Sequence, residues 1–523
     1  MISQMRRVHS SGGGRGSAST TTTGTMHAKD YRFSLGDSFK LWWEELSNYD
    51  DADRLAQDRF LKYVVPYYRP QELVEDKFKE LRAFSVKTML EKDGGEDGQW
   101  YMNEVRVEKR ANANHREDVS GNTRHLVMLH GYGASSGWFY KNFTGIAEKC
   151  RQETNLTIHA LDMIGFGLSG RPSVSYKHDA DTKPNLDIET EGIKWGKYAT
   201  CIKCGGHLDG KVSKKLHWCN CADEEASIRE GTSSESAKII VQKRDIVEYL
   251  DNHKELIREV EDVYVESLEK WRIANGIEKF DLLAHSLGGY LGMTYLLKHP
   301  ERVGNVIMVS PGGVERTPFA ITNPAYEMIH AKRDVEGVYE MAVSNDVREY
   351  GFLGRYGIID PTFRDVWNMR MSMMTMLRWM GPLGGKALFD RNLSKLTRSG
   401  EITDAREVEL FMKYNYSCLI RASFAETSIT RLFDASVVGK WPLLDKLRDD
   451  NGSAMADRRI LWLYGEHDFM YKACGEAGAA SISNSSSSSN ASAEFAVVSN
   501  AGHNLYLDAS GAFNDAVVGF LDV

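Results

Sequence analysis

The chain has 523 residues and a formal net charge of −8, with 42% hydrophobic and 26% charged residues. This is the composition of an ordinary globular protein, and the acidic balance excludes a generally nucleic-acid-binding chain, which would be basic. No apolar run approaches the roughly 20 residues that a membrane-spanning helix needs, so contact with a membrane is expected only at its surface. Seven cysteines are too few for a disulfide scaffold.

The first 35 residues are predicted to be a disordered or targeting segment. Residues 1–29 contain four basic and no acidic residues among many Ser, Thr and Gly, a composition typical of a mitochondrial or plastid transit peptide. We therefore expect a mitochondrial location, with a cytoplasmic or lipid-droplet-associated protein as the alternative. Residues 36–80 follow as an N-terminal helical segment, where Phe39, Trp42 and Trp43 recur at helical spacing and face either lipid or the rest of the domain.

Short apolar runs with little polar alternation come next, as in parallel strands that are buried on both faces. We expect strands at 83–90, 100–108, 125–130, 156–162, 279–285, 303–310, 458–464 and 494–499, and helices at 238–275 and 287–299. Strands that alternate with helices predict an α/β fold with a mostly parallel central sheet.

Inserted material divides this core in two. The first part spans 81–314 and holds a polar, cysteine-rich insertion at 173–236, and the second spans 456–523 and holds a Ser-rich loop at 481–493. Residues 315–455 lie between the two parts and are too long for a simple crossover, so we interpret them as a helical cap.

A small-x-Ser-x-Gly pattern follows the expected strand at 279–285. Ala284 and Gly288 flank Ser286 at the two positions that must be small in a tight strand-to-helix turn. Such a turn lifts the serine hydroxyl above the sheet edge, at a helix N-terminus that favours developing negative charge. Ser286 is therefore the candidate nucleophile.

A second glycine-rich turn, His130-Gly131-Tyr132-Gly133, ends the strand at 125–130. In a fold with this serine turn, an oxyanion hole takes one N–H from this loop and one from the residue after the nucleophile. Tyr132 and Leu287 are the candidates, while Gly131 and Gly133 let the backbone approach the substrate closely. His130 is expected to be a packed, hydrogen-bonded side chain that supports this motif, as Gly288 supports the serine turn.

The acid and the base follow in the expected chain order after the serine. Asp468 comes just past the strand at 458–464 and is the candidate orienting carboxylate, with Glu466 as the fallback. His503 follows the last strand and is the candidate general base, because a serine needs a histidine to take its proton. His467, like His130, is expected to be a packed structural histidine.

The motifs HGYGAS, DMIGFGLSGRP, AHSLGG, GEHD and AGHNLYLD resemble, in this order, those of the α/β-hydrolase superfamily. The chain is more narrowly similar to the subfamily of α/β-hydrolase-domain proteins 4 and 5, with fungal relatives that include a cardiolipin-specific deacylase and a lysophosphatidic acid acyltransferase. The narrower likeness is carried by Trp138-Phe139 and by an H-x4-D pattern from His503 to Asp508. Asp508 is expected to begin or cap the final helix. The stretch 162–169 is interpreted as a structural turn.

The resemblance implies lipid acyl-ester chemistry without a catalytic cofactor. The expected function is a serine hydrolase that cleaves acyl esters of phospholipids or lysophospholipids through an acyl-enzyme. One alternative is a lysophosphatidic acid acyltransferase that uses the same Ser286 and His503, and another is a non-catalytic adaptor on a lipid surface. The expected partners are a lipid acyl ester and a peripheral membrane or lipid-droplet surface, but no nucleic acid.

Two further patterns remain. Residues 367–380 hold six Met and two Trp, which fits either an adaptable lid over an acyl-chain pocket or filler in the core of the cap. Four cysteines in two close pairs have the composition of a closed structural Zn²⁺ site, with a redox pair or ordinary thiols as alternatives. These residues are Cys201, Cys204, Cys219 and Cys221.

Overall fold

The protein is described from a computed structural model. The described residues are 7–8, 26–49, 51–70, 81–91, 98–111, 123–191, 238–317, 320–342, 361–435, 437–450, 453–485 and 490–523. The four cysteines of the expected zinc site and most of the expected targeting segment lie outside them. Within the described residues, no helix combines the length and the apolar character that crossing a bilayer requires.

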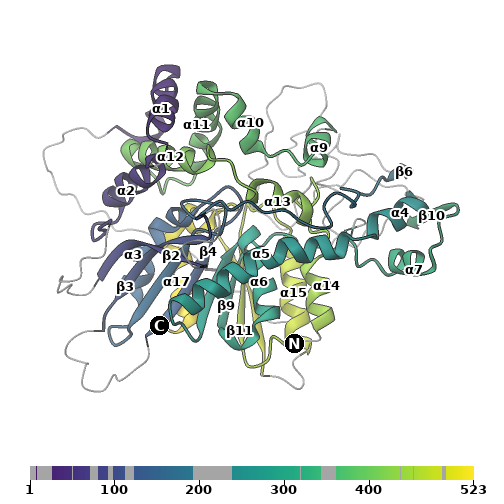
Figure 1. Ribbon diagram of the computed structural model, residues 1–523. Helices are drawn as coiled ribbons and strands as arrows, with labels where there is room; N and C mark the ends of the chain where they lie inside the picture. The colour runs from purple at the N-terminus through teal and green to yellow at the C-terminus, as the bar shows by residue number, and fades with distance from the viewer. Residues whose placement is uncertain are drawn as a thin grey trace, which may run out of the picture.

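A nine-stranded sheet forms the centre of the molecule (Figure 1). Its strands, in spatial order, are β1 (Arg7–Val8), β12 (Ser492–Val498), β11 (Arg459–Gly465), β9 (Val303–Val309), β8 (Phe280–His285), β4 (Arg124–Leu129), β5 (Leu156–Leu161), β3 (Tyr101–Lys109) and β2 (Leu81–Met89). β3 pairs antiparallel with β2 and β5, and the other pairs are parallel. The expected mostly parallel sheet is therefore confirmed.

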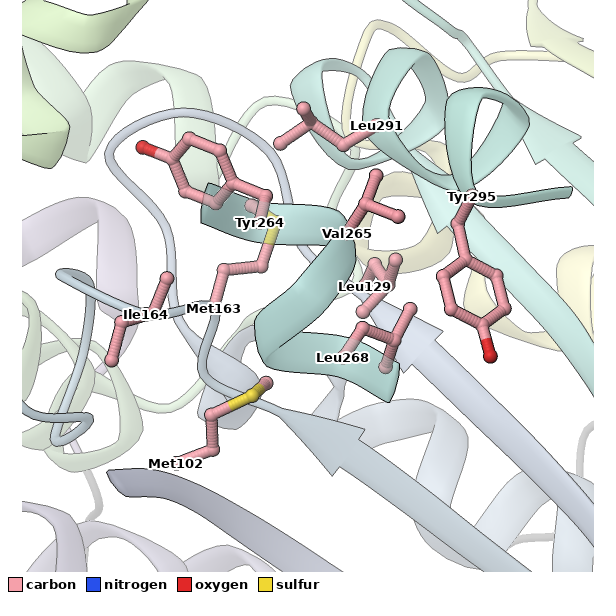
Figure 2. Close-up of a pocket in the computed structure, with 9 residues that line it drawn as sticks. All are labelled: Met102, Leu129, Met163, Ile164, Tyr264, Val265, Leu268, Leu291 and Tyr295. Atoms are coloured by element: carbon pink, nitrogen blue, oxygen red, sulfur yellow. The ribbon is translucent and has the colours of Figure 1, made fainter. Parts of the chain in front are cut away.

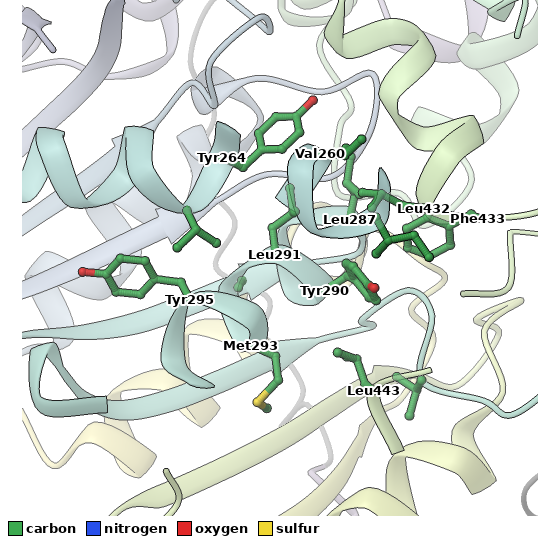
Figure 3. Packing of buried hydrophobic residues seen from close by; sticks show 14 of the residues in the cluster. Val260, Tyr264, Leu287, Tyr290, Leu291, Met293, Tyr295, Leu432, Phe433 and Leu443 are labelled. Carbon is green, nitrogen blue, oxygen red and sulfur yellow. The ribbon is translucent and has the colours of Figure 1, made fainter. Parts of the chain in front are cut away.

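Two buried cores lie on the two faces of this sheet, because its central strands are apolar on both sides. One core includes α3 (Tyr140–Lys149), α16 (Leu505–Asp508) and α17 (Ser510–Leu521). The other includes α5 (His253–Ala274), α6 (Leu287–Lys298), α14 (Leu443–Asp450) and α15 (Lys472–Ser485). Figure 3 shows α6 in this second core, where Leu291 faces Tyr264 of α5 and Tyr290 lies beside Phe433.

Most of the cap lies above the sheet and consists mainly of helices, whereas its first helix, α7, lies to the side of the sheet (Figure 1). Its helices are α7 (Pro324–Lys332), α9 (Pro361–Asn368), α10 (Met373–Trp379), α11 (Pro382–Leu396), α12 (Ala405–Leu419) and α13 (Ala425–Leu432). The N-terminal helices α1 (Leu35–Ser47) and α2 (Ala52–Val64) pack on α11 and α12, so the N-terminal helical segment is spatially part of the cap. Short 3-10 turns occur at η1 (Ala28–Asp30), η4 (Ser136–Phe139) and η5 (Pro300–Arg302).

The structure corrects two local expectations. Residues 238–242 were expected to be helical but form strand β7 (Lys238–Gln242), which pairs antiparallel with β6 (Glu189–Glu191) and β10 (Val338–Ala342), and helix α4 (Lys243–Leu250) begins only after it. β-Branched residues fit this pairing better than a helix start. The Ser-rich loop is shorter than expected, since α15 continues to Ser485 around the buried Ile482 and β12 begins at Ser492.

Candidate active site

Ser286 occupies the tight turn between β8 and α6, where the sequence placed the nucleophile. Its backbone has φ 54° and ψ −116°, a left-handed conformation that is strained for a serine. The turn is held because the Ser286 N–H donates to the Val309 carbonyl at 3.0 Å and the Gly312 N–H donates to the Ser286 carbonyl at 2.9 Å. The hydroxyl group thus stands at the N-terminus of α6.

His503 lies between Ser286 and Asp468 and contacts both. Its Nε2 is 3.0 Å from Ser286 Oγ, and its Nδ1 is 2.9 Å from Asp468 Oδ1. These contacts fit a neutral imidazole that donates from Nδ1 to the carboxylate and accepts the serine proton at Nε2. The structure therefore brings together the three residues that sequence analysis selected from three separate loops.

The carboxyl group of Asp468 is fully buried, while His503 remains 17% exposed. Burial alone would raise the pKa of Asp468, but the electrostatic interaction with His503 and the hydrogen bond from its ring hold that pKa below its usual range. The Met470 N–H donates a further hydrogen bond to Oδ1 at 3.0 Å. Asp468 is therefore an ionised acceptor at neutral pH, which orients the ring.

The two expected oxyanion donors belong to the two chain segments that meet at the serine turn. Leu287 is the first residue of α6, so its N–H has no acceptor within the helix. A Cβ on Gly131 would lie 2.9 Å from Ser286 Cβ, and a Cβ on Gly288 would lie 2.5 Å from the His130 carbonyl oxygen. The loop that carries Tyr132 thus packs directly on the serine turn, and only glycine permits this approach.

Two buried side chains hold the glycine-rich loop in place. His130 Nε2 accepts the Met163 N–H at 3.1 Å, so its Nδ1 carries the proton and donates to the Gly131 carbonyl at 2.8 Å. Asp162 accepts the Ser136 N–H at 2.6 Å and the Leu168 N–H at 2.9 Å. The stretch 162–169 is accordingly the structural turn that was expected, and burial lowers the pKa of His130.

Three other polar residues lie near the site, and two of them, His467 and Asp508, differ from expectation. His467 is exposed, not packed, because it lies on the outer side of the loop after β11. Glu466 accepts the Asn500 N–H at 2.9 Å and does not contact His503, so Asp468 is the carboxylate in place. Asp508 neither begins nor caps α17, whose N-cap is Ala509.

Asp508 instead supports the loop that carries the base. It is the last residue of α16, and its Oδ2 accepts the Gly502 N–H at 2.9 Å. Burial raises the pKa of Asp508 above its usual range, although this hydrogen bond and nearby Arg398 oppose the shift. The H-x4-D spacing therefore links Asp508 to the backbone next to His503 and not to its ring.

Sequence reasoning missed His285, which precedes the serine. Its Nε2–H donates to the His503 carbonyl at 3.0 Å, and its ring lies 4.7 Å from the His503 ring. Burial and then the neighbouring His503 lower the pKa of His285 well below its usual value, so it is neutral. This hydrogen bond joins the serine turn to the loop that carries His503. A sequence motif cannot reveal it, because the accepting carbonyl is 218 residues away.

The cap reaches the site through α10 and α13. The Met374 methyl group would lie 3.3 Å from a Cβ on Gly133, so α10 rests on the glycine-rich loop. Arg378 of α10 forms a two-pronged ion pair with buried Glu426 of α13, at 2.6 and 2.7 Å. The Tyr132 hydroxyl group donates to the Glu426 carbonyl at 2.7 Å. The Met-rich stretch thus lies over the site, with some residues directed inward and others outward.

A small internal cavity lies apart from the serine, between the sheet, α5 and α6 (Figure 2). Its volume is about 20 Å³ and its lining is mostly apolar, including Met102, Leu268 and Leu291. A cavity of this size holds about one water molecule, so it is a packing defect and does not accommodate an acyl chain.

Metal binding finds no support within the described part of the chain, where no three His, Cys, Asp or Glu side chains gather as a metal site would require. The zinc hypothesis concerns cysteines outside this part and stays a prediction, as does the mitochondrial location. The described cysteines, Cys150, Cys418 and Cys474, are all buried.

The parallel sheet and the serine turn at its edge are typical of α/β hydrolases, and comparison with known families agrees. The chain belongs to the alpha/beta hydrolase fold family, whose model matches residues 124–510. Protein ECM18 of Saccharomyces cerevisiae is 24% identical over 487 residues, covering 92% of this chain and 83% of that protein.

Two other relatives carry names that refer to acyl transfer. The 1-acylglycerol-3-phosphate O-acyltransferase ICT1 of Saccharomyces cerevisiae is 24% identical over 400 residues, covering 76% of this chain and 81% of that protein. The human 1-acylglycerol-3-phosphate O-acyltransferase ABHD5 is 26% identical over 193 residues, covering 37% of this chain and 31% of that protein. The chain is thus similar to proteins of the narrower subfamily that its motifs resemble.

Proposed function

We propose that this protein is a serine enzyme that cleaves acyl esters of phospholipids or lysophospholipids. The observation that carries the proposal is the hydrogen-bonded series from Asp468 through His503 to Ser286. Relatives named as 1-acylglycerol-3-phosphate O-acyltransferases support a lipid acyl group as the part of the substrate that reacts.

In the first half-reaction, Ser286 Oγ attacks the acyl carbonyl carbon while His503 Nε2 takes its proton. The N–H groups of Tyr132 and Leu287 stabilise the negative charge on the carbonyl oxygen. The ester bond then breaks, and His503 returns the proton to the departing alcohol oxygen of the lysolipid or glycerol backbone. Asp468 stabilises the imidazolium without taking its proton.

In the second half-reaction, water attacks the acyl-enzyme. His503 removes a proton from the water, and the same two N–H groups stabilise the second oxyanion. Collapse releases the fatty acid and returns the proton from His503 to Ser286 Oγ. The net reaction consumes one ester bond and one water molecule, and it needs no cofactor.

The test combines labelling with product analysis. The purified protein is incubated with a mixed lipid extract, and products are read by mass spectrometry alongside labelling by a fluorophosphonate. Ser286→Ala is expected to lose both labelling and ester turnover, whereas Ser399→Ala, a change at an exposed serine of the cap, keeps both. Undiminished turnover by Ser286→Ala would refute the proposal. Lipid binding without turnover by the unaltered protein would favour a non-catalytic adaptor.

Acyl transfer is the second candidate, and the names of the relatives favour it. A lysophosphatidic acid hydroxyl group would replace water as the acceptor, with His503 removing its proton in the same position. Incubation with labelled acyl-CoA and lysophosphatidic acid separates the outcomes. Label in phosphatidic acid supports transfer, and label only in free fatty acid supports hydrolysis.

A further inference from the structure

The cap contacts the candidate active site at two places that differ in polarity. At the first, the Met374 methyl group of α10 lies against the glycine-rich loop at Gly133. At the second, the end of α11 approaches the loop that carries His503, where the Arg398 guanidinium group lies 3.6 Å from the position of a Cβ on Gly502. The contact with the glycine-rich loop is therefore apolar, and the contact with the base loop carries a positive charge.

Arg398 is one of three neighbouring cations at the end of α11. Arg391 and Lys395 precede it at spacings of seven and three, which are those of a single helix face, and all three residues are exposed. Among the described side chains, no carboxylate forms an ion pair with them, whereas Lys386 of the same helix pairs with Asp390. We call Arg391, Lys395 and Arg398 the cationic cluster.

Ordinary structural roles account for only part of this cluster. Cations near the end of a helix interact favourably with its dipole, which fits Arg391 and Lys395 but does not explain why the Arg398 guanidinium group extends to a loop of the catalytic core. The acid at that loop is Asp508, and its Oδ2 accepts the Gly502 N–H at 2.9 Å. The charge of Arg398 opposes the rise in the pKa of Asp508 that burial causes, but the two side chains form no ion pair.

The three cations repel one another. Partial desolvation, and then the guanidinium groups of Arg391 and Arg398, hold the pKa of Lys395 below its usual range. The whole chain carries a net charge of −8, so this local excess of positive charge is contrary to the average of the molecule. A bound anion would relieve the repulsion, and a guanidinium group is suited to phosphate because it donates two parallel N–H groups to phosphate oxygens.

The location of the cluster determines which part of a substrate it meets. In the proposed mechanism, His503 Nε2 gives a proton to the departing alcohol oxygen or takes one from an acceptor alcohol. The alcohol part of the substrate therefore lies beside His503, and the acyl chain extends from the carbonyl carbon that Ser286 attacks. In an acyl ester of glycerol phosphate, the phosphate is only a few bonds from the reacting oxygen, which places it near Gly502 and Arg398.

We infer that the cationic cluster is a subsite for the phosphate monoester of a glycerol phosphate, an assignment that rests on the proposed acyl-ester function. Arg398 determines the specificity by donating two N–H groups to the phosphate oxygens, and Lys395 and Arg391 add attraction from a greater distance. Met374 lies at the glycine-rich loop, so the two cap contacts match the apolar and the anionic parts of such a substrate. The same subsite serves hydrolysis, where glycerol phosphate departs, and transfer, where it belongs to the acceptor.

Two water-soluble substrates test the subsite in the full chain without a lipid surface. Hexanoyl lysophosphatidic acid and monohexanoylglycerol differ only in the phosphate, and each is used below the concentration at which it aggregates. We expect the unaltered chain to cleave the phosphate substrate with a kcat/KM at least about tenfold higher. Arg398→Gln should lower this kcat/KM at least about tenfold, mainly through KM, and change that of the neutral substrate less than about twofold.

Three further variants separate the charge from the structure. Arg398→Lys keeps the charge but not the paired N–H donors, so it should recover part of the preference for phosphate. Arg391→Gln/Lys395→Gln should lower that preference about two- to fivefold, because these cations act from a greater distance across solvent. The matched control Lys386→Gln removes the same charge from the same helix, at a position that pairs with Asp390, and should keep the full preference. Circular dichroism verifies that each variant is folded.

Binding of the head group alone tests the subsite without turnover. Glycerol phosphate, inorganic phosphate and glycerol are titrated by calorimetry into Ser286→Ala and into Ser286→Ala/Arg398→Gln. We expect glycerol phosphate to bind more tightly than inorganic phosphate, and the loss of Arg398 to weaken its binding at least about tenfold. Equal affinity for glycerol phosphate and inorganic phosphate would overturn the inference and assign the cluster to free phosphate.

The results that contradict the subsite differ from those that contradict the proposed function. If the unaltered chain cleaves neither substrate, the proposed function fails, and the calorimetric titrations decide on the subsite. Cleavage of both substrates with equal kcat/KM, or an Arg398→Gln variant that keeps the preference for phosphate, would overturn the subsite alone. An equal loss with both substrates in Arg398→Gln would also overturn it, because Arg398 would then position the base loop and not bind phosphate.

Discussion

Replacing Asp468 with Asn tests the candidate site most sharply. Asp468 is fully buried and accepts hydrogen bonds from His503 Nδ1 at 2.9 Å and from the Met470 N–H at 3.0 Å. Asn preserves the shape of this side chain but carries no charge to stabilise the imidazolium that forms during attack. When its NH₂ group faces Nδ1, the ring carries its proton on Nε2 and cannot accept the proton of Ser286.

The expected magnitude follows from these contacts. A hydrogen bond to a charged group contributes about 1.5–3 kcal/mol, and each ~1.4 kcal/mol lost from the transition state is about tenfold in rate. The wrong tautomer adds to this loss, and the same change in a serine protease lowers kcat by about 10⁴. We therefore expect Asp468→Asn to lose between about 10² and 10⁴ in kcat with little change in KM.

The assay is release of p-nitrophenol from a short-chain p-nitrophenyl ester, with Glu466→Gln as the matched control. The Glu466 carboxylate accepts the Asn500 N–H from the neighbouring loop, and the Glu466 backbone carbonyl, which the substitution keeps, accepts a hydrogen bond from Lys472. This change should therefore alter kcat by less than about threefold. The reasoning would be refuted if Asp468→Asn kept a third of the activity, or if Glu466→Gln lost as much as Asp468→Asn.

The difference in free energy of unfolding between the unaltered chain and Asp468→Asn is expected to depend on pH. Because the pKa of Asp468 in the folded chain lies below its usual range, its ionised form stabilises the fold at pH values above about 4. That contribution is lost as the pH falls through the lowered pKa. The difference in free energy of unfolding between the unaltered chain and Asp468→Asn should therefore shrink on acidification. A difference that grew below pH ~4 would contradict this account.

Three further substitutions test the surroundings of the site. Glu426→Gln leaves the Arg378 charge unpaired in the cap and should lower the free energy of unfolding by about 2 kcal/mol in denaturant titrations, less than a fully buried pair because Arg378 is partly exposed. Asp508→Asn keeps an oxygen for the Gly502 N–H and should retain at least about a third of the ester turnover. Gly131→Ala places a Cβ 2.9 Å from the serine Cβ and should reduce kcat about 100-fold.

Each of these results has an alternative that would refute its reasoning. A stability unchanged by Glu426→Gln would mean that the ion pair does not hold α10 in place. A loss of 100-fold or more in Asp508→Asn would make this carboxyl group an orienter of the base and not a brace of its loop. Normal turnover by Gly131→Ala would mean that the glycine-rich loop lies away from the reacting carbonyl.

The residues at the sheet edge could be selected from sequence because their chemistry constrains their neighbours. A strained serine turn requires small flanking residues, and the acid and the base must follow strands that end at the same edge. Ser286, Asp468 and His503 therefore left local signals in the chain. His285 left none, because its function depends on a distant carbonyl group and many residue types fit the position next to a nucleophile.

The helices of the cap, the strand Lys238–Gln242 and the exposure of His467 were less predictable, because they depend on partners that are distant in the sequence. Helical periodicity indicated that Phe39, Trp42 and Trp43 lie on a helix, but not which partner covers which side. Lys238–Gln242 was expected to continue a helix, yet pairing with β10 outweighs local helical preference there. His467 was expected to be packed, although exposure depends on which side of a loop faces the protein, and no sequence pattern encodes that choice.

The small sheet formed by β6, β7 and β10 has a consequence for how this chain tolerates change. Glu191, the last residue of β6, pairs directly with Lys238, the first residue of β7. The segment that joins these two residues therefore begins and ends at adjacent points of the fold. The entropic cost of closing such a loop rises by only about 0.6 kcal/mol for each doubling of its length. The number of residues that join Glu191 to Lys238 can therefore change at little entropic cost, because the pairing of these two residues keeps the ends of that segment together.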